Sequence, residues 1–136
     1  MRDVLPHIHE GVGLLFVIAA ATAFVWAWTL SRRHKPLPKA YWSFIRVGVG
    51  GLFGLQILLG LSLLALGFHV PTPLHWLYVV LLILGVGAGE MLRPGSGMRQ
   101  MVAGGGPFDE TRTYWILMLF VAVIALRAWT TGLFGF

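Results

Sequence analysis

Four long stretches of apolar residues alternate with shorter polar segments along the chain. They cover about residues 9–31, 44–68, 74–92 and 113–132, and the last of them is interrupted by Arg127. A helix needs about 20 apolar residues to cross the hydrocarbon core of a bilayer. Backbone groups in lipid must be hydrogen-bonded within a helix or a closed barrel, and no stretch shows the alternation of a barrel strand. The pattern therefore predicts four transmembrane helices.

We expect an all-α fold, an up-down bundle of four transmembrane helices that occupies residues 1–136 as a single domain. Of the 136 residues, 57% are apolar and only 11% are charged, less than a soluble domain of this size needs. The first stretch is too long for the core of a signal peptide, and Arg32 and Arg33 follow it where a cleavage site would be. We therefore expect it to be a retained helix.

The basic residues predict the orientation. Eight of the ten lie in or beside the first and third connections, whereas the second connection, residues 69–73, has none. By the positive-inside rule the two basic connections are cytoplasmic, and both termini lie on the non-cytoplasmic side. We expect a multi-pass protein of the cell's inner (plasma) membrane. Because the positive charges lie where the positive-inside rule places them, the net charge gives no indication of nucleic-acid binding.

Four of the five histidines fall at the non-cytoplasmic ends of the predicted helices: His7, His9, His69 and His75. His9 opens the first span and His75 opens the third, and these two helices run in the same direction. In a four-helix bundle they are diagonal partners, with axes roughly 11–14 Å apart. That spacing suits a porphyrin whose iron takes one imidazole from each side. We expect His9 and His75 as the axial ligands, with His7 and His69 as alternatives.

Two other interpretations of these histidines remain open. Histidines at a membrane interface also cap helices or bind lipid headgroups, and the same four residues are a candidate site for a metal without porphyrin. The chain contains no cysteine, which excludes disulfides, thiolate ligands and a Cys nucleophile. The covalent haem motif C-x-x-C-H is therefore missing too, so the expected cofactor is a non-covalent b-type haem.

Two polar residues within the spans are further candidates for cofactor binding. Arg127 lies toward the same side as the histidines, and it either pairs with a haem propionate or extends to the headgroups. Gln56 either hydrogen-bonds to another helix or contacts the cofactor. Gly50 and Gly54 form a small-xxx-small motif in the same span as Gln56, which predicts close packing of that helix on a neighbour.

The order of these motifs resembles one half of the haem A synthase family. The similar segments are residues 8–15 (IHEGVGLL), 55–60 (LQILLG) and 73–77 (PLHWL), and the resemblance extends roughly over residues 6–92. The family contains two four-helix repeats, each with a histidine opening one helix and another opening the helix two further on. The resemblance implies a four-helix membrane bundle with a bis-histidine haem site at His9 and His75.

The chain departs from the family pattern around the first histidine. The family has a glutamate three residues before it and an arginine after it, where this chain has Pro6 and Glu10. That glutamate is implicated in the family's oxidative chemistry, so the resemblance implies the scaffold and the haem site rather than the enzyme activity.

Three functions follow as expectations from the spans, the histidines and the resemblance. The first is a cytochrome-like protein for electron transfer or haem handling near the outer face of the membrane. The second is a haem-modifying enzyme, and the third is an accessory subunit without a cofactor. The expected partners are the lipid bilayer and either a second copy, because the chain has half the family's length, or a larger respiratory or photosynthetic complex.

Overall fold

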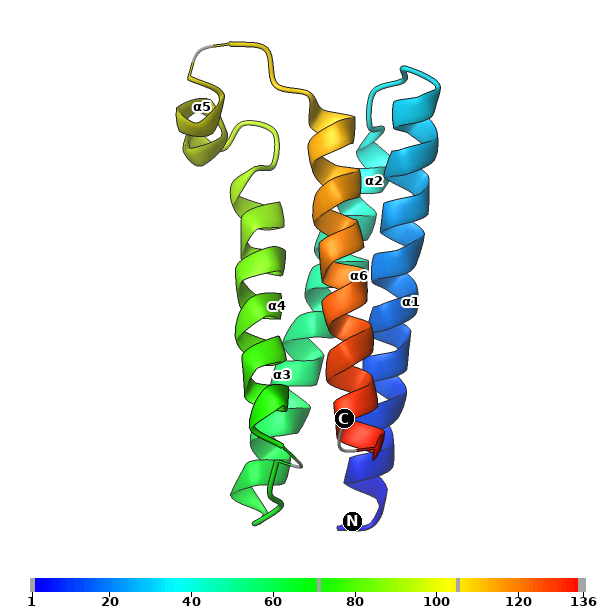
Figure 1. Cartoon of the computed structure of the whole chain (residues 1–136), viewed down its shortest axis with the longest axis vertical. Helices are drawn as coiled ribbons and strands as arrows, with labels where there is room; N and C mark the ends of the chain where they lie inside the picture. The colour runs from blue at the N-terminus through cyan, green and yellow to red at the C-terminus, as the bar shows by residue number, and fades with distance from the viewer. Residues whose placement is uncertain (1, 71, 105, 135–136) are drawn as a thin grey trace.

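The computed structural model describes residues 2–70, 72–104 and 106–134. Within these residues four helices are long and apolar enough to cross a membrane, which confirms that part of the prediction. Within the described residues all regular structure is helical, and the long helices stand side by side (Figure 1). Their bounds are Val4–Arg32 (α1), Lys39–Ala65 (α2, η1 and α3 in succession), Pro73–Met91 (α4) and Glu110–Phe134 (α6).

The second long helix contains a segment of π-helix that the apolar pattern does not predict. It consists of α2 (Lys39–Ser43), η1 (Phe44–Gly50) with its wider turns, and α3 (Gly51–Ala65). A Cβ at Gly48 would lie 3.2 Å from the ring of Phe44, so a glycine relieves the crowding within these turns. Because π-turns change the direction in which later side chains point, η1 sets the rotation of α3 relative to its neighbours.

A short helix, α5 (Gly97–Ala103), lies in the connection between α4 and α6, outside the four predicted spans. It ends at Gly104, whose φ of 58° is the left-handed conformation that commonly ends a helix. Gly97 and Gly104 therefore lie at the two ends of α5. None of the residues of α5 is buried.

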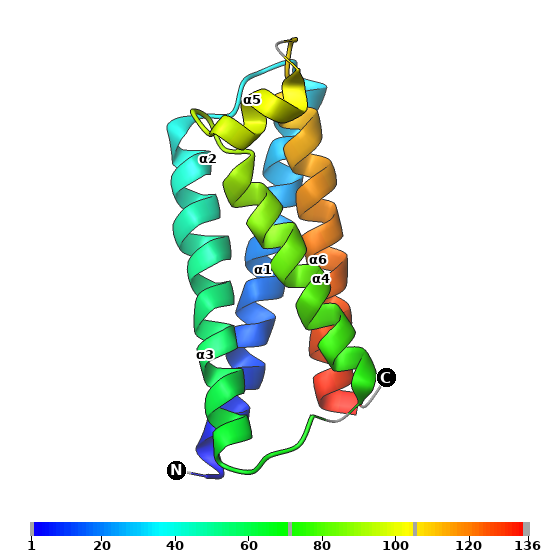
Figure 2. The same ribbon diagram turned by 90° about the vertical axis from the view of Figure 1, so that its left-hand side faces the viewer.

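The four long helices form a bundle in which α1 and α4 occupy opposite corners (Figure 2). α1 packs most extensively on α6 and also on α3, while α4 packs on α6. The centre of the α1 face is built from alanines, whose small side chains let the helices approach closely. α3 contains no buried residue and makes little contact with α4, so these two neighbouring helices are loosely packed.

The close glycine contact lies elsewhere than the sequence predicts. A Cβ at Gly54 would have nothing within 4 Å, and one at Gly50 would meet only the Ile45 carbonyl oxygen at 3.5 Å. By contrast, a Cβ at Gly85 would lie 3.0 Å from Val121 and 3.1 Å from Phe120. The predicted close packing through Gly50 and Gly54 is therefore wrong, since a Cβ at either position has no other helix within 4 Å. Gly85 provides the contact instead, between α4 and α6.

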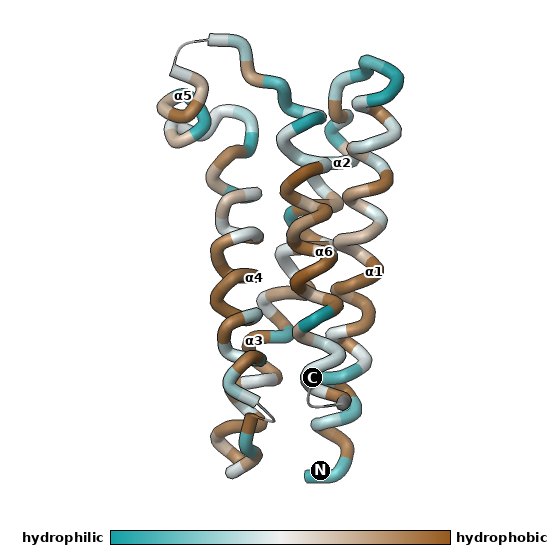
Figure 3. The backbone as a smooth tube through the Cα atoms, viewed as in Figure 1, coloured by the Kyte–Doolittle hydropathy of each residue, from teal (hydrophilic) through white to brown (hydrophobic). Residues whose placement is uncertain are grey.

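The two ends of the bundle differ in chemistry. The first turns of α1 and the last turns of α6 lie at one end, which we call the histidine end; α2 and α5 lie at the other, which we call the basic end (Figure 1). Hydrophilic segments gather at the basic end, and the long helices are mainly hydrophobic between the ends (Figure 3). At the basic end, buried Tyr114 donates a hydrogen bond to the Gly89 carbonyl (2.6 Å) and Tyr41 donates one to Ala23 (3.3 Å). These bonds join α6 to α4 and α2 to α1.

Candidate functional site

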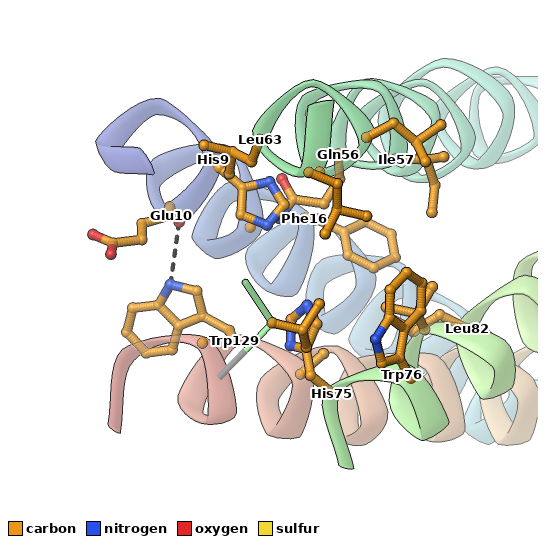
Figure 4. Close-up of a pocket in the computed structure, with 18 of the residues that line it drawn as sticks. His9, Glu10, Phe16, Gln56, Ile57, Leu63, His75, Trp76, Leu82 and Trp129 are labelled. Carbon is orange, nitrogen blue, oxygen red and sulfur yellow. Dashed lines mark hydrogen bonds between the residues drawn. The ribbon is translucent and has the colours of Figure 1, made fainter. Parts of the chain in front are cut away.

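A cavity of about 300 Å³ lies at the histidine end, with walls from α1, α3, α4 and α6. Its lining is mainly apolar. The polar side chains along it include five that the sequence places at or near this site: His9, Glu10, Gln56, His69 and His75. Figure 4 shows His9 and His75 reaching into the cavity from opposite sides, with Gln56 beside His9. The structure therefore brings the two predicted axial ligands to one space.

His9 lies in the second turn of α1 rather than at its start, because the helix already begins at Val4. Its Nε2 atom is 3.2 Å from Nε2 of Gln56 on α3. The other ring nitrogen, Nδ1, and Oε1 of Gln56 are buried without a hydrogen-bond partner. Exchanging the amide O and N would still leave one polar atom on each side chain unpaired. An unpaired buried polar atom costs about 1–3 kcal/mol, so these two atoms favour a bound ligand or water.

His75 lies in the first turn of α4, and a threonine of α6 holds its ring. His75 Nδ1 is 3.3 Å from Oγ1 of Thr131, which is fully buried. Thr131 donates its only hydroxyl hydrogen to the Ala128 carbonyl at 2.9 Å. When that hydrogen lies on Ala128, the Thr131 oxygen accepts a hydrogen bond from His75 Nδ1–H. In the neutral imidazole this leaves Nε2 with its lone pair free, the arrangement usual for a histidine that binds a metal.

Small residues and one tryptophan keep the helices close around the cavity. Trp129 of α6 donates from Nε1 to the Glu10 carbonyl of α1 at 3.1 Å (Figure 4). A Cβ at Gly13 would lie 3.1 Å from Gln56 Nε2 and 3.2 Å from Trp129 Cδ1. A Cβ at Gly60 would lie 3.4 Å from Cε1 of His9. These glycines leave room for the amide, the indole and the imidazole that border the cavity.

Two candidate residues lie outside the cavity. The Arg127 side chain is exposed on α6, and its guanidinium carbon lies 5.8 Å from the ring centroid of Tyr78. His7 is exposed on α1, with Nδ1 3.6 Å from a carboxylate oxygen of Glu10. Neither lines the cavity, whereas the alternative ligand His69 does. The structure therefore groups His9, His75 and Gln56, and it leaves Arg127 and His7 apart from them.

No group of three or more histidine and carboxylate side chains comes together within residues 2–70, 72–104 and 106–134 in a way that could hold a metal ion. The interpretation of His7, His9, His69 and His75 as a metal site without porphyrin therefore has no geometric support. Two imidazoles alone bind a metal firmly only when another group supplies the remaining ligands.

Thr131 is a neighbour of the site that the sequence does not single out. It stands in an apolar stretch where a threonine is unremarkable. One signal was available for Thr131: it lies close to the end of α6, as His75 lies close to the start of α4. Equal distance from the helix ends places the two residues at similar depth once α4 is known to pack on α6. Only the tertiary structure shows that α4 packs on α6.

Comparisons of the chain with known protein families, with curated proteins and with solved structures find no match. The cavity and its two histidines are the structural basis for a functional proposal.

Proposed function

We propose that this chain is a small membrane protein that binds b-type haem through His9 and His75 and serves electron transfer or haem handling. The observation that carries the proposal is the placement of both imidazoles on opposite sides of one apolar cavity (Figure 4). Each ring also has a nitrogen without a hydrogen bond to the described protein: Nδ1 of His9 is buried and unpaired, and Nε2 of His75 is free. Paired imidazoles on facing helices are a common way to hold haem iron.

The surroundings fit a flat apolar macrocycle. The volume of about 300 Å³ is at the lower end of the roughly 300–1,000 Å³ usual for small-ligand pockets. α3 and α4 make little contact, so they can part around a larger ligand without breaking the packing of α1 on α6. A haem with two imidazole ligands supplies one-electron transfer when bound. The chain contributes ligands, a water-excluding wall, and Thr131 to hold the ring of His75.

The proposed site contains no acidic group at the position that matters for haem modification in the resembling family. Pro6 lines the cavity, so this position faces the proposed haem but has no ionisable side chain. We therefore favour a cytochrome-like role over an enzyme related to haem A synthase. The proposal also leaves Arg127 without a propionate contact, because its side chain lies over Tyr78 away from the cavity.

We also propose that the bundle is up-down, with the histidine end on the non-cytoplasmic side of the cell's inner membrane. The support is the distribution of basic residues, which concentrate in the connections at the opposite end. This orientation places the haem near the outer face, where it can exchange electrons with a partner on that side. A second copy of the chain or a larger membrane complex is the partner class that this placement suits.

The direct test is the absorption spectrum of the detergent-purified protein, first oxidised and then reduced with dithionite. We expect sharp reduced α and β bands, either as purified or after adding haem, because two imidazoles give low-spin iron. Acidified acetone should extract the pigment with the mass of unmodified haem b, since the chain has no cysteine to anchor it. A protein that stays colourless after haem addition would rule out the proposal, and extraction of a chemically altered haem would favour the enzyme instead.

Thr131→Val is expected to weaken haem binding about 10–100-fold, the usual effect of removing a residue that orients a metal-ligating histidine. Valine has nearly the shape of threonine but cannot accept the His75 Nδ1–H bond. The measurement is haem titration of the purified variant, followed by absorbance. Thr130→Val is the matched control, since that hydroxyl bonds only the Arg127 carbonyl of its own helix. Equal affinities for the two variants would contradict the role of Thr131.

A further inference from the structure

A second cavity, of about 280 Å³, lies nearer the basic end between η1, α4 and α6. Phe53 lines both cavities. The wall of the second is apolar except for one carboxylate, that of Glu90. Because Glu90 is near the end of α4, the cavity extends from the apolar middle of the bundle toward the basic end.

Two glycines on facing helices keep this second cavity open. A Cβ at Gly87 of α4 would meet nothing within 4 Å, and Gly50 at the end of η1 borders the same space. The fully buried side chain of Met118 on α6 lines the inner wall of this cavity. The face that the sequence assigns to helix packing through Gly50 is thus part of a groove between helices.

Two arginines stand at the polar end of the groove and share the carboxylate of Glu90. Arg46 of η1 places Nη2 3.3 Å from Glu90 Oε1, and Arg93, just beyond α4, places Nε 3.2 Å from the same oxygen. The three groups together carry one net positive charge. The side chains of Arg46 and Arg93 are 61% and 49% exposed, so most of their N–H donors remain available to a further anion.

We propose that this groove binds an anionic phospholipid, with an acyl chain in the second cavity and the phosphate at Arg46 and Arg93. A small soluble anion would leave the apolar cavity unfilled, and a neutral apolar ligand would form no ion pair with the two guanidinium groups. An amphiphile with a negative head matches both features, and the bilayer supplies it at high local concentration. Basic pockets between transmembrane helices on the cytoplasmic side are known to bind such headgroups.

The test is native mass spectrometry of the purified full-length chain with equal amounts of phosphatidylglycerol and phosphatidylcholine. We expect the wild type to retain phosphatidylglycerol preferentially. Each of Arg46→Gln and Arg93→Gln should lower that preference about fivefold, the usual effect of one basic side chain at an anionic surface. Arg32→Gln is the matched control, because Arg32 is at the same end but lies over the Trp28 ring outside the groove. A loss as large in Arg32→Gln would overturn the proposal.

A groove-filling variant tests the acyl-chain part separately. Gly87→Leu has space for its first side-chain atom and should lower lipid retention several-fold, because the leucine occupies part of the acyl-chain cavity. Gly11→Leu is its control, since a Cβ there also meets nothing within 4 Å but Gly11 does not line the groove. Excess glycerol phosphate should not displace the lipid. If it does, or if Gly87→Leu binds as the wild type does, the site recognises only an anion. Helicity measured by circular dichroism confirms that each variant is folded.

Discussion

His9→Ala and His75→Ala are each expected to eliminate the sharp reduced bands of haem from the purified protein. Each variant removes one of two axial ligands from an apolar cavity that offers no comparable donor besides His69. The loss of affinity should exceed the about 10–100-fold predicted for Thr131→Val, because a ligand is removed rather than a residue that orients it. Reduced-minus-oxidised spectra at matched protein concentration measure the effect.

His34→Asn is the control for these two variants. His34 lies in the connection at the basic end, and its φ of 52° is a conformation that asparagine tolerates, so the change preserves the backbone. It should leave the spectrum unchanged. His69→Ala decides between ligands: if it removes the bands while His9→Ala keeps them, the assignment of His9 is wrong. Free imidazole should restore part of the spectrum of His75→Ala, because the deleted side chain leaves space for it.

Gly85→Leu is expected to separate α4 from α6 and to lower the thermal stability of the protein in detergent. The first side-chain atom alone would lie 3.0 Å from Val121, and the rest of the leucine has no space on this face. Overpacking of this kind typically costs about 1–3 kcal/mol. Differential scanning fluorimetry, with size-exclusion chromatography to detect aggregation, measures the loss.

Gly54→Leu is the matched comparison for Gly85→Leu, since both introduce the same side chain into a transmembrane helix. A Cβ at Gly54 meets nothing within 4 Å, so this variant should unfold at or above the temperature of the wild type. If Gly54→Leu is the more damaging of the two, the second long helix packs through its glycine motif after all. Because α4 supplies His75, Gly85→Leu should also weaken haem binding, whereas Gly54→Leu should not.

The candidate site was partly predictable from the sequence. The positions of His9 and His75 near corresponding ends of the first and third long helices depend only on counting residues along apolar stretches. Their approach to one cavity follows from that depth and from the opposite corners that α1 and α4 occupy. Arg127 shows the limit of such counting. It has a suitable depth, but the direction of its side chain around α6 takes it to Tyr78 and away from the cavity.

The sequence by itself determined the class of protein and the four long helices, because burial in lipid depends on local apolar content and every helix satisfies its own backbone. Only the tertiary structure decided which small residues lie between helices. A Cβ at Gly85 would contact α6, whereas a Cβ at Gly54 would contact no other helix. This difference arises because the rotation of each helix about its axis depends on the packing of all four helices and on the π-turns of η1. The bond of Thr131 to His75 was decided in the same way, because it joins residues of two helices that pack together only in the folded bundle.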